Sequence, residues 1–155
     1  MYKLSLSDHN FTIKKEQGKT YILDSIRKKY VRLTPEEWVR QHTVRYLIDH
    51  KKFPQSLMKI EVGLDVYSLL KRADILCYTS KGEPLVLVEC KAPEVAINQA
   101  VFEQIAQYNI VLQAPYLLVT NGVKMYSCTI NFAEKTFEFL HEFPTYTEMI
   151  TLLNI

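Results

Sequence analysis

Three residues in this chain, Asp74, Glu89 and Lys91, have the types and the spacing of a hydrolytic site. The last two interrupt an apolar run, PLVLVECKAP, that is typical of a buried strand. Successive side chains of a strand point to opposite faces, so Glu89 and Lys91 are expected on one face and Cys90 on the other. A second run, ADILCY, carries Asp74, and antiparallel pairing through the turn TSKGEP would bring its carboxylate close to Glu89.

Two carboxylates beside an amine are suited to metal-assisted hydrolysis. Mg²⁺ binds through one or two carboxylates and keeps waters and phosphate oxygens as its other ligands. The ion lowers the pKa of a bound water, while Lys91 orients that water or stabilises the charge of the transition state. The alternative is a cross-strand ion pair on a half-exposed sheet. The apolar residues before Glu89 favour the site, because charges at the end of a buried strand cost desolvation energy.

Periodicity and turn signals predict the elements that position these residues. Helices are expected from Pro35 to about His50, after a Thr34 cap, and over 94–112, with a short closing helix at the C-terminus. A hairpin that turns at Gly18 is expected at the edge of the sheet. The strands of the main sheet are expected at 58–70, 73–78, 85–91, 116–120, 124–129 and 136–142, with turns at 71–72 and at Asn121-Gly122.

This order predicts an α/β (α+β) chain with a central mixed sheet flanked by helices. One domain is expected over 1–155, with an N-terminal hairpin extension at about 10–25. The sequence has no run of eighteen apolar residues and no apolar signal segment, so a cytoplasmic protein without membrane insertion is expected. The three cysteines lack the spacing of a zinc site or a disulfide framework and are expected to be reduced core residues.

Charge is distributed unevenly along the chain. Residues 1–60 hold thirteen Lys and Arg against six Asp and Glu, whereas residues 61–155 hold six against eleven. Basic residues gathered near the acids would offset the repulsion between a carboxylate cluster and a phosphate backbone. The best candidates are Arg27, Lys28 and Lys29, against the alternative of lysines scattered over a solvated surface.

Several strings together resemble the PD-(D/E)XK nuclease superfamily, and within it the N-terminal nuclease domain of type I restriction enzyme motor (R) subunits. These strings are KRADILCY, VECKAP, FEQIAQYN and LLVTNG, and the match runs from about Ile26 to Tyr126. Ala73 stands where this superfamily usually has proline. The resemblance implies a restriction-endonuclease-like fold and DNA as the substrate. It also implies Mg²⁺ as the cofactor, with Mn²⁺ as a substitute.

The resemblance also implies roles for individual residues. Asp74, Glu89 and the backbone carbonyl of Cys90 would hold the metal, and Lys91 would act on the water. Gln104 and Tyr108 match a Gln-x-x-x-Tyr element that contacts DNA near the site. An additional acid is expected on the helix that begins at Pro35, where Glu37 is favoured over Glu36. The alternative reading of both glutamates is helix capping after Thr34, because Thr34-x-x-Glu37 is a capping-box pattern.

Two functions follow. The first is a Mg²⁺-dependent DNA endonuclease, and the second is a catalytically weak or inactive DNA-binding accessory module of the same fold. The sequence has no Walker loop and no helicase signature, so a motor or specificity protein would have to act in trans. A homodimer is a further expectation, since nucleases that cut both strands often pair. A third, plainer alternative is an accessory domain whose charged sheet end serves protein contacts.

Overall fold

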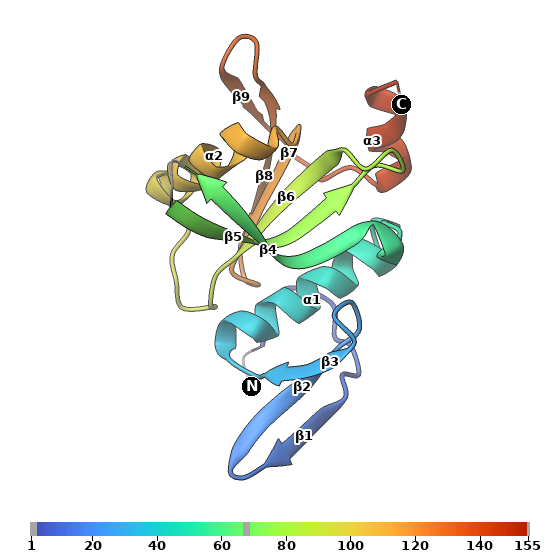
Figure 1. The fold of residues 1–155 in the computed structure, drawn as a ribbon, viewed down its shortest axis with the longest axis vertical. Coiled ribbons are helices and arrows are strands. Elements are labelled where there is room, and N and C mark those ends of the chain that lie inside the picture. The colour runs from blue at the N-terminus through green and yellow to red at the C-terminus, as the bar shows by residue number, and fades with distance from the viewer. Residues whose placement is uncertain (1–2, 67–68, 155) are drawn as a thin grey trace.

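A computed structural model of the chain describes residues 3–66 and 69–154. In these residues, two β-sheets lie on either side of helix α1, which spans Pro35–Asp49 (Figure 1). The larger sheet has six strands in the order β4-β5-β6-β7-β8-β9, and the smaller has three in the order β1-β2-β3. The expected mixed sheet with flanking helices is confirmed.

The large sheet is antiparallel except for one parallel pair, β6 with β7. Helix α2, Gln99–Leu112, makes the crossover that a parallel pair requires. Strands β6 and β7 are buried along most of their length and lie at the centre of the core. The strands of this sheet are β4 (Met58–Val66), β5 (Leu69–Tyr78), β6 (Pro84–Cys90), β7 (Tyr116–Thr120), β8 (Met125–Asn131) and β9 (Thr136–Phe139).

The N-terminal hairpin belongs to a sheet of its own, not to the edge of the large sheet as expected. Its strands β1 (Ile13–Glu16) and β2 (Lys19–Asp24) are joined by a third, β3 (Lys29–Arg32). The third strand pairs with β2, and α1 lies between this small sheet and β4–β9 (Figure 1). Ile22 in β2 is fully buried, so the small sheet has an interior face.

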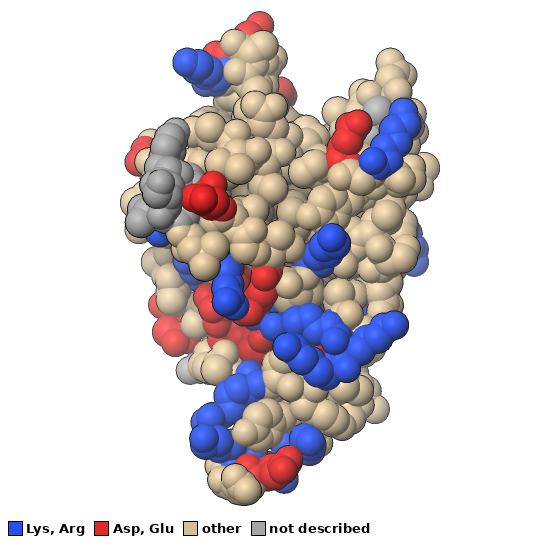
Figure 2. Space-filling view, in the orientation of Figure 1, with Lys and Arg blue, Asp and Glu red and all other residues tan. Residues whose placement is uncertain are grey.

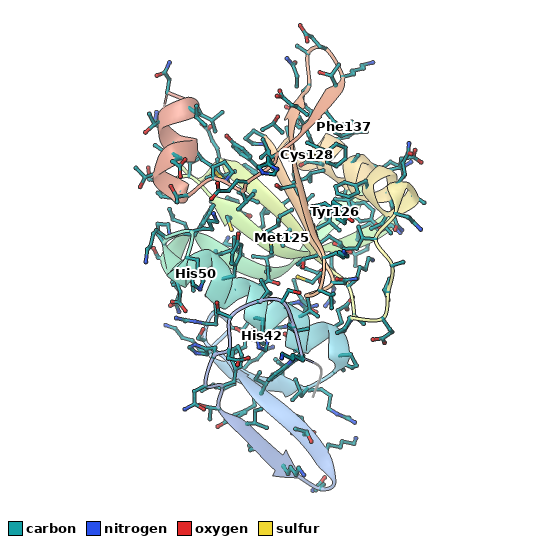
Figure 3. The ribbon with its side chains drawn as sticks, turned by 180° about the vertical axis from the view of Figure 1, so that it is seen from behind. His42, His50, Met125, Tyr126, Cys128 and Phe137 are labelled. Atoms are coloured by element: carbon teal, nitrogen blue, oxygen red, sulfur yellow. The ribbon has the colours of Figure 1, made fainter. Side chains whose placement is uncertain are left out.

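Helix α1 is buried more completely than an ordinary surface helix because it is covered on two sides. The Glu37 N–H donates to Thr34 Oγ1 at 3.0 Å, which caps the helix at its expected start. The ring of Phe11 packs at a tilt of 59° against the rings of Trp38 and His42. Viewed from behind, His42 and His50 lie along α1 beside the N-terminal segment (Figure 3). The amino-terminal residues thus fix one side of the helix.

Several predicted boundaries differ from the structure. Lys71 and Arg72 lie inside β5 rather than in a turn, and residues 67–68 of the expected first strand lie outside the described residues. Helix α2 begins at Gln99 rather than at 94, because Asn98 supplies the cap for the Val101 N–H. Residues 121–124 form the β7–β8 connection, where Asn121 Oδ1 accepts two backbone N–H groups. The closing helix α3 spans Tyr146–Leu152, and a 3₁₀ turn, η1, spans Gln55–Leu57.

Candidate active site

The structure brings Asp74, Glu89 and Lys91 together at the ends of two neighbouring strands. Ile75 pairs with Val88, and the same register places Asp74 of β5 opposite Glu89 of β6. The Cys90 N–H donates to Asp74 Oδ2 at 2.8 Å, which fixes one oxygen of that carboxylate. Lys91 Nζ lies 3.2 Å from Glu89 Oε1. Two acids and an amine therefore share one face of the sheet.

The proximity of the two acids affects their protonation. Burial raises the pKa of Glu89 to about 8, and the charge of Asp74 adds to this while Lys91 opposes it. Burial opposes the charge of Lys91, but Glu89, Asp74 and Glu36 together raise the pKa of its ammonium above its ordinary value. Burial and the charge of Asp74 thus disfavour the ionised form of Glu89, and Lys91 offsets only part of their effect.

The two candidate glutamates of α1 lie on different sides of the helix. Glu37 is buried, and its carboxylate accepts from Arg27 and Arg40 through Oε1 and from Gln41 through Oε2. Glu36 is about half exposed, and burial followed by the charge of Asp74 raises its pKa. The pKa of Glu36 therefore depends on the charges of Asp74 and Lys91. The Glu37 carboxylate is instead held by hydrogen bonds from two arginines and an amide.

Arg40 and Glu61 belong to the site although the sequence pattern did not single them out. The Arg40 guanidinium contacts Asp74 Oδ1 at 2.9 Å, Glu37 Oε1 at 2.6 Å and Glu61 Oε1 at 3.1 Å. Glu61 lies in β4, where the β4–β5 register places it opposite Asp74. Glu61, Asp74 and Glu89 thus form a row of three carboxylates across three adjacent strands. An acid in the middle of the apolar run MKIEVGL was the signal that could have indicated Glu61.

Arg27 extends this network toward the small sheet. Its Nε, Nη2 and Nη1 atoms face Asp24 at 2.6 Å, Glu37 at 3.0 Å and Glu61 at 3.6 Å. Asp24 is buried, and although burial opposes its charge, hydrogen bonds from Arg27 and Gln41 lower its pKa. All three nitrogen atoms of the guanidinium are therefore directed at carboxylates inside the protein.

By contrast, Lys28 in the turn between β2 and β3 and Lys29 at the start of β3 are exposed. On the face shown in Figure 2, acidic side chains gather in the middle of the molecule, with Lys and Arg around and below them. The upper part of that face is largely uncharged. The basic groups in the middle and lower parts of this face thus lie close to the central carboxylates.

Gln104 and Tyr108 lie one turn apart on α2. Gln104 is exposed, while Tyr108 is partly buried against the core cluster beneath the helix. Burial, and then the charge of Glu89, raises the pKa of the Tyr108 hydroxyl. Lys71 Nζ lies 5.7 Å from the centre of the Tyr108 ring. The pKa of the Tyr108 hydroxyl therefore depends on the charge of Glu89 in the candidate site.

The three cysteines are free and buried, as expected. Burial raises the pKa of the Cys90 thiol well above its ordinary value, and this thiol lies in the core on the face opposite Glu89. Within the described ranges, no group of three or more His, Cys, Asp or Glu side chains has the geometry to hold a metal ion.

The sequence pattern of the family described as "Type I restriction enzyme R protein N terminus" matches residues 35–144, which contain every residue of this site except Asp24, Arg27, Lys28 and Lys29. The chain belongs to this family. The R-protein resemblance expected from the sequence is therefore confirmed. The chain has no significant match among curated proteins.

The R-protein fold also has a solved counterpart. A fragment assigned to the HsdR subunit of a type I restriction enzyme from Vibrio vulnificus YJ016 superposes with a TM-score of 0.58 at 19% sequence identity. The alignment covers 78% of this chain but only 25% of that fragment. At this identity the match shows a shared fold. Among the helices that the structure describes in this R-protein N-terminal domain, none is long and apolar enough to cross a membrane.

Proposed function

We propose that this R-protein N-terminal domain is a metal-dependent DNA endonuclease of the PD-(D/E)XK type. The observation that carries the proposal is the convergence of Asp74, Glu89 and Lys91. One Asp74 oxygen is fixed by the Cys90 N–H at 2.8 Å, and Lys91 Nζ lies 3.2 Å from Glu89. An ordinary surface ion pair would not be buried beside a second acid, whereas burial and then the charge of Asp74 raise the pKa of Glu89 to about 8.

The donor set fits a hard divalent cation. Carboxylate oxygens are the ligands that Mg²⁺ prefers, with Mn²⁺ as a substitute. A cation between Asp74 and Glu89 would offset the effect of the Asp74 charge, which adds to burial in raising the pKa of Glu89. Asp74, Glu89 and the backbone carbonyl of Cys90 would hold the ion. When bound, it would lower the pKa of a water and neutralise charge on the scissile phosphate.

The protein's own groups would do the remaining work. Lys91 would orient the attacking water and stabilise the negative charge that develops on the phosphate oxygens. Glu36 would be the additional acid, because it responds to Asp74 and Lys91, while Glu37 would hold the two arginines in place. This assignment reverses the preference for Glu37 over Glu36 that was expected from the sequence.

DNA would approach across the exposed basic groups. Lys28 and Lys29 would contact the phosphate backbone, and Gln104 with Tyr108 would contact DNA from α2. Arg27 would contribute indirectly, by anchoring Glu37 and Glu61. A motor or specificity protein acting with this domain is part of the proposal, and the domain aligns with 25% of the HsdR fragment. A homodimer would place two sites on opposite strands.

A second candidate is a DNA-binding module of the same fold with weak or no cleavage. The contact between Arg40 and Asp74 Oδ1 favours it, because a guanidinium occupies an oxygen that a metal ion would use. The two candidates share the DNA surface and differ only in whether the carboxylates bind a cation productively.

Cleavage of linear, supercoiled and single-stranded DNA with Mg²⁺ or Mn²⁺ tests the proposal. We expect Lys91→Ala to abolish cleavage, because the charge on the transition state loses its nearest ammonium. Lys81→Ala is the matched control, since Lys81 is exposed on the turn between β5 and β6, the strands that carry Asp74 and Glu89. Salt-sensitive DNA binding with no cleavage by the wild type would support the second candidate. Equal cleavage by wild type and Lys91→Ala would contradict the first.

A further inference from the structure

Arg40 is the most deeply enclosed cation of the charged network. The residue is 4% exposed, and its Nη1 contacts Glu37 and Glu61 while its Nη2 contacts Asp74. Its Nε is buried and has no hydrogen-bond partner among the described residues. Although burial opposes the charge, Glu37 and Asp74 raise the pKa of the guanidinium above its ordinary value, so it remains charged.

This position has a consequence for Asp74. Its Oδ2 accepts from the Cys90 N–H and its Oδ1 accepts from Arg40, so each oxygen already has a partner. A divalent cation bound between Asp74 and Glu89 would have to share Oδ1 with the guanidinium or take it. The two cations repel each other strongly at such short range in a partly buried site. Simultaneous full contact of both with Oδ1 is therefore unfavourable.

Glu61 offers Arg40 an alternative partner. It lies on the strand next to Asp74, and its Oε1 is 3.1 Å from Arg40 Nη1. Its backbone has φ of 54°, a left-handed conformation that a glutamate inside a strand rarely adopts. The other Glu61 oxygen faces Arg27 at 3.6 Å and Arg72 at 3.3 Å. Glu61 is thus held beside Arg40 from several directions.

We propose that Arg40 is the resident counter-ion of this site. It neutralises Asp74 while no divalent ion is bound, and it remains on Glu37 and Glu61 when a divalent ion takes Asp74 Oδ1. Arg40 and Glu61 are then positioning residues that set the affinity for the metal without being ligands. The inference rests on the proposed metal site, and it adds the prediction that binding of the ion and release of Asp74 by Arg40 are coupled.

Mn²⁺ binding, followed by electron paramagnetic resonance of the free ion, tests this coupling without an activity assay. We expect Arg40→Gln to bind Mn²⁺ at least about tenfold more tightly than wild type, because the competing charge is gone. We expect Glu61→Gln to bind about tenfold more weakly, because Arg40 then has one partner fewer besides Asp74. Arg45→Gln is the matched control on the same helix, since Arg45 pairs with Asp49 away from the site.

The Arg40→Gln/Glu61→Gln double variant shows whether Glu61 affects Mn²⁺ binding through Arg40 or directly through its own negative charge. If Glu61 acts through Arg40, the weakening caused by Glu61→Gln falls to about threefold or less in the Arg40→Gln background. Equal effects of Glu61→Gln in both backgrounds would overturn the inference, as would a folded Arg40→Gln protein that binds Mn²⁺ no more tightly than wild type. Absence of binding to wild type and to every variant would instead overturn the proposed metal site, and the inference with it.

Wild-type protein provides a readout that does not depend on the folding of a variant. The buried Nε–H of Arg40 gives an NMR signal that is assigned through its contacts to neighbouring protons. We expect this signal to shift during Mg²⁺ titration with the same midpoint as ion binding measured by calorimetry, while the Arg45 signal stays fixed. Saturable Mg²⁺ binding that leaves the Arg40 signal unchanged would overturn the inference. Binding that is absent from both measurements would overturn the proposed site.

Discussion

Replacing Glu89 with glutamine should make the protein more stable at high pH and change little at low pH. Burial and the neighbouring Asp74 raise the pKa of Glu89 from 4.5 to about 8 in the folded protein. The folded state therefore holds this proton more tightly than the unfolded chain does. The resulting contribution to stability is fully present below the unfolded pKa and is lost as the pH rises through the folded pKa.

The size of the effect follows from the displacement of the pKa. Each pKa unit corresponds to about 1.4 kcal/mol, so the full rise from 4.5 to about 8 amounts to about 5 kcal/mol. About 2 to 3 kcal/mol of this falls between about pH 5 and pH 7. Glutamine has no proton to lose at this position. The free energy of unfolding of Glu89→Gln, relative to that of wild type, should therefore rise by about 2 to 3 kcal/mol between about pH 5 and pH 7.

Urea unfolding in the presence of EDTA, repeated from about pH 5 to pH 8.5, measures the difference. Histidines and other titrating groups are common to both proteins, so their contributions cancel. Glu83→Gln is the control, since Glu83 is an exposed glutamate just before β6. Parallel curves for wild type and Glu89→Gln would refute the reasoning, because they would mean that Glu89 has the same pKa in the folded and unfolded states.

Two further outcomes concern the core. Cys77, Cys90 and Cys128 are buried, so a thiol reagent should modify none of them rapidly in the native protein and all three in denaturant; rapid native reaction would contradict the packing of β5, β6 and β8. Asn109→Ala should lower the free energy of unfolding by about 2 to 3 kcal/mol, because the buried amide bonds both the N–H and the carbonyl of Ala114. Urea denaturation measures this loss, and an unchanged midpoint would contradict it.

The parts of the fold that could be predicted depend on local pattern. The apolar runs of β6 and β7, the cap at Thr34 and the alternation through Glu89, Cys90 and Lys91 each leave a signal in neighbouring residues. The proximity of Asp74 to Glu89 also follows from one short turn and an antiparallel register. These predictions need only periodicity and chain connectivity.

The parts that could not be predicted depend on contacts between distant segments. Arg40 lies on a helix where an arginine is usually solvated, and only the packing of α1 against β5 makes it a partner of Asp74. The burial of Glu37 against Arg27 and Arg40 depends on the sheet that lies on each side of α1 (Figure 1). The third strand of the small sheet was missed because KYVR is short and follows a positively charged turn.

The small sheet has a bearing on where this domain should be considered to begin. The matching family pattern starts at residue 35, after β3, yet Asp24 and Arg27 supply partners to Gln41 and Glu37 on α1. A protein that begins at residue 35 would lack the small sheet, so one side of α1 would be exposed to solvent. Gln41 and Glu37 would also lose their hydrogen bonds to Asp24 and Arg27. The contacts that hold α1 in place therefore extend beyond the stretch that sequence similarity outlines.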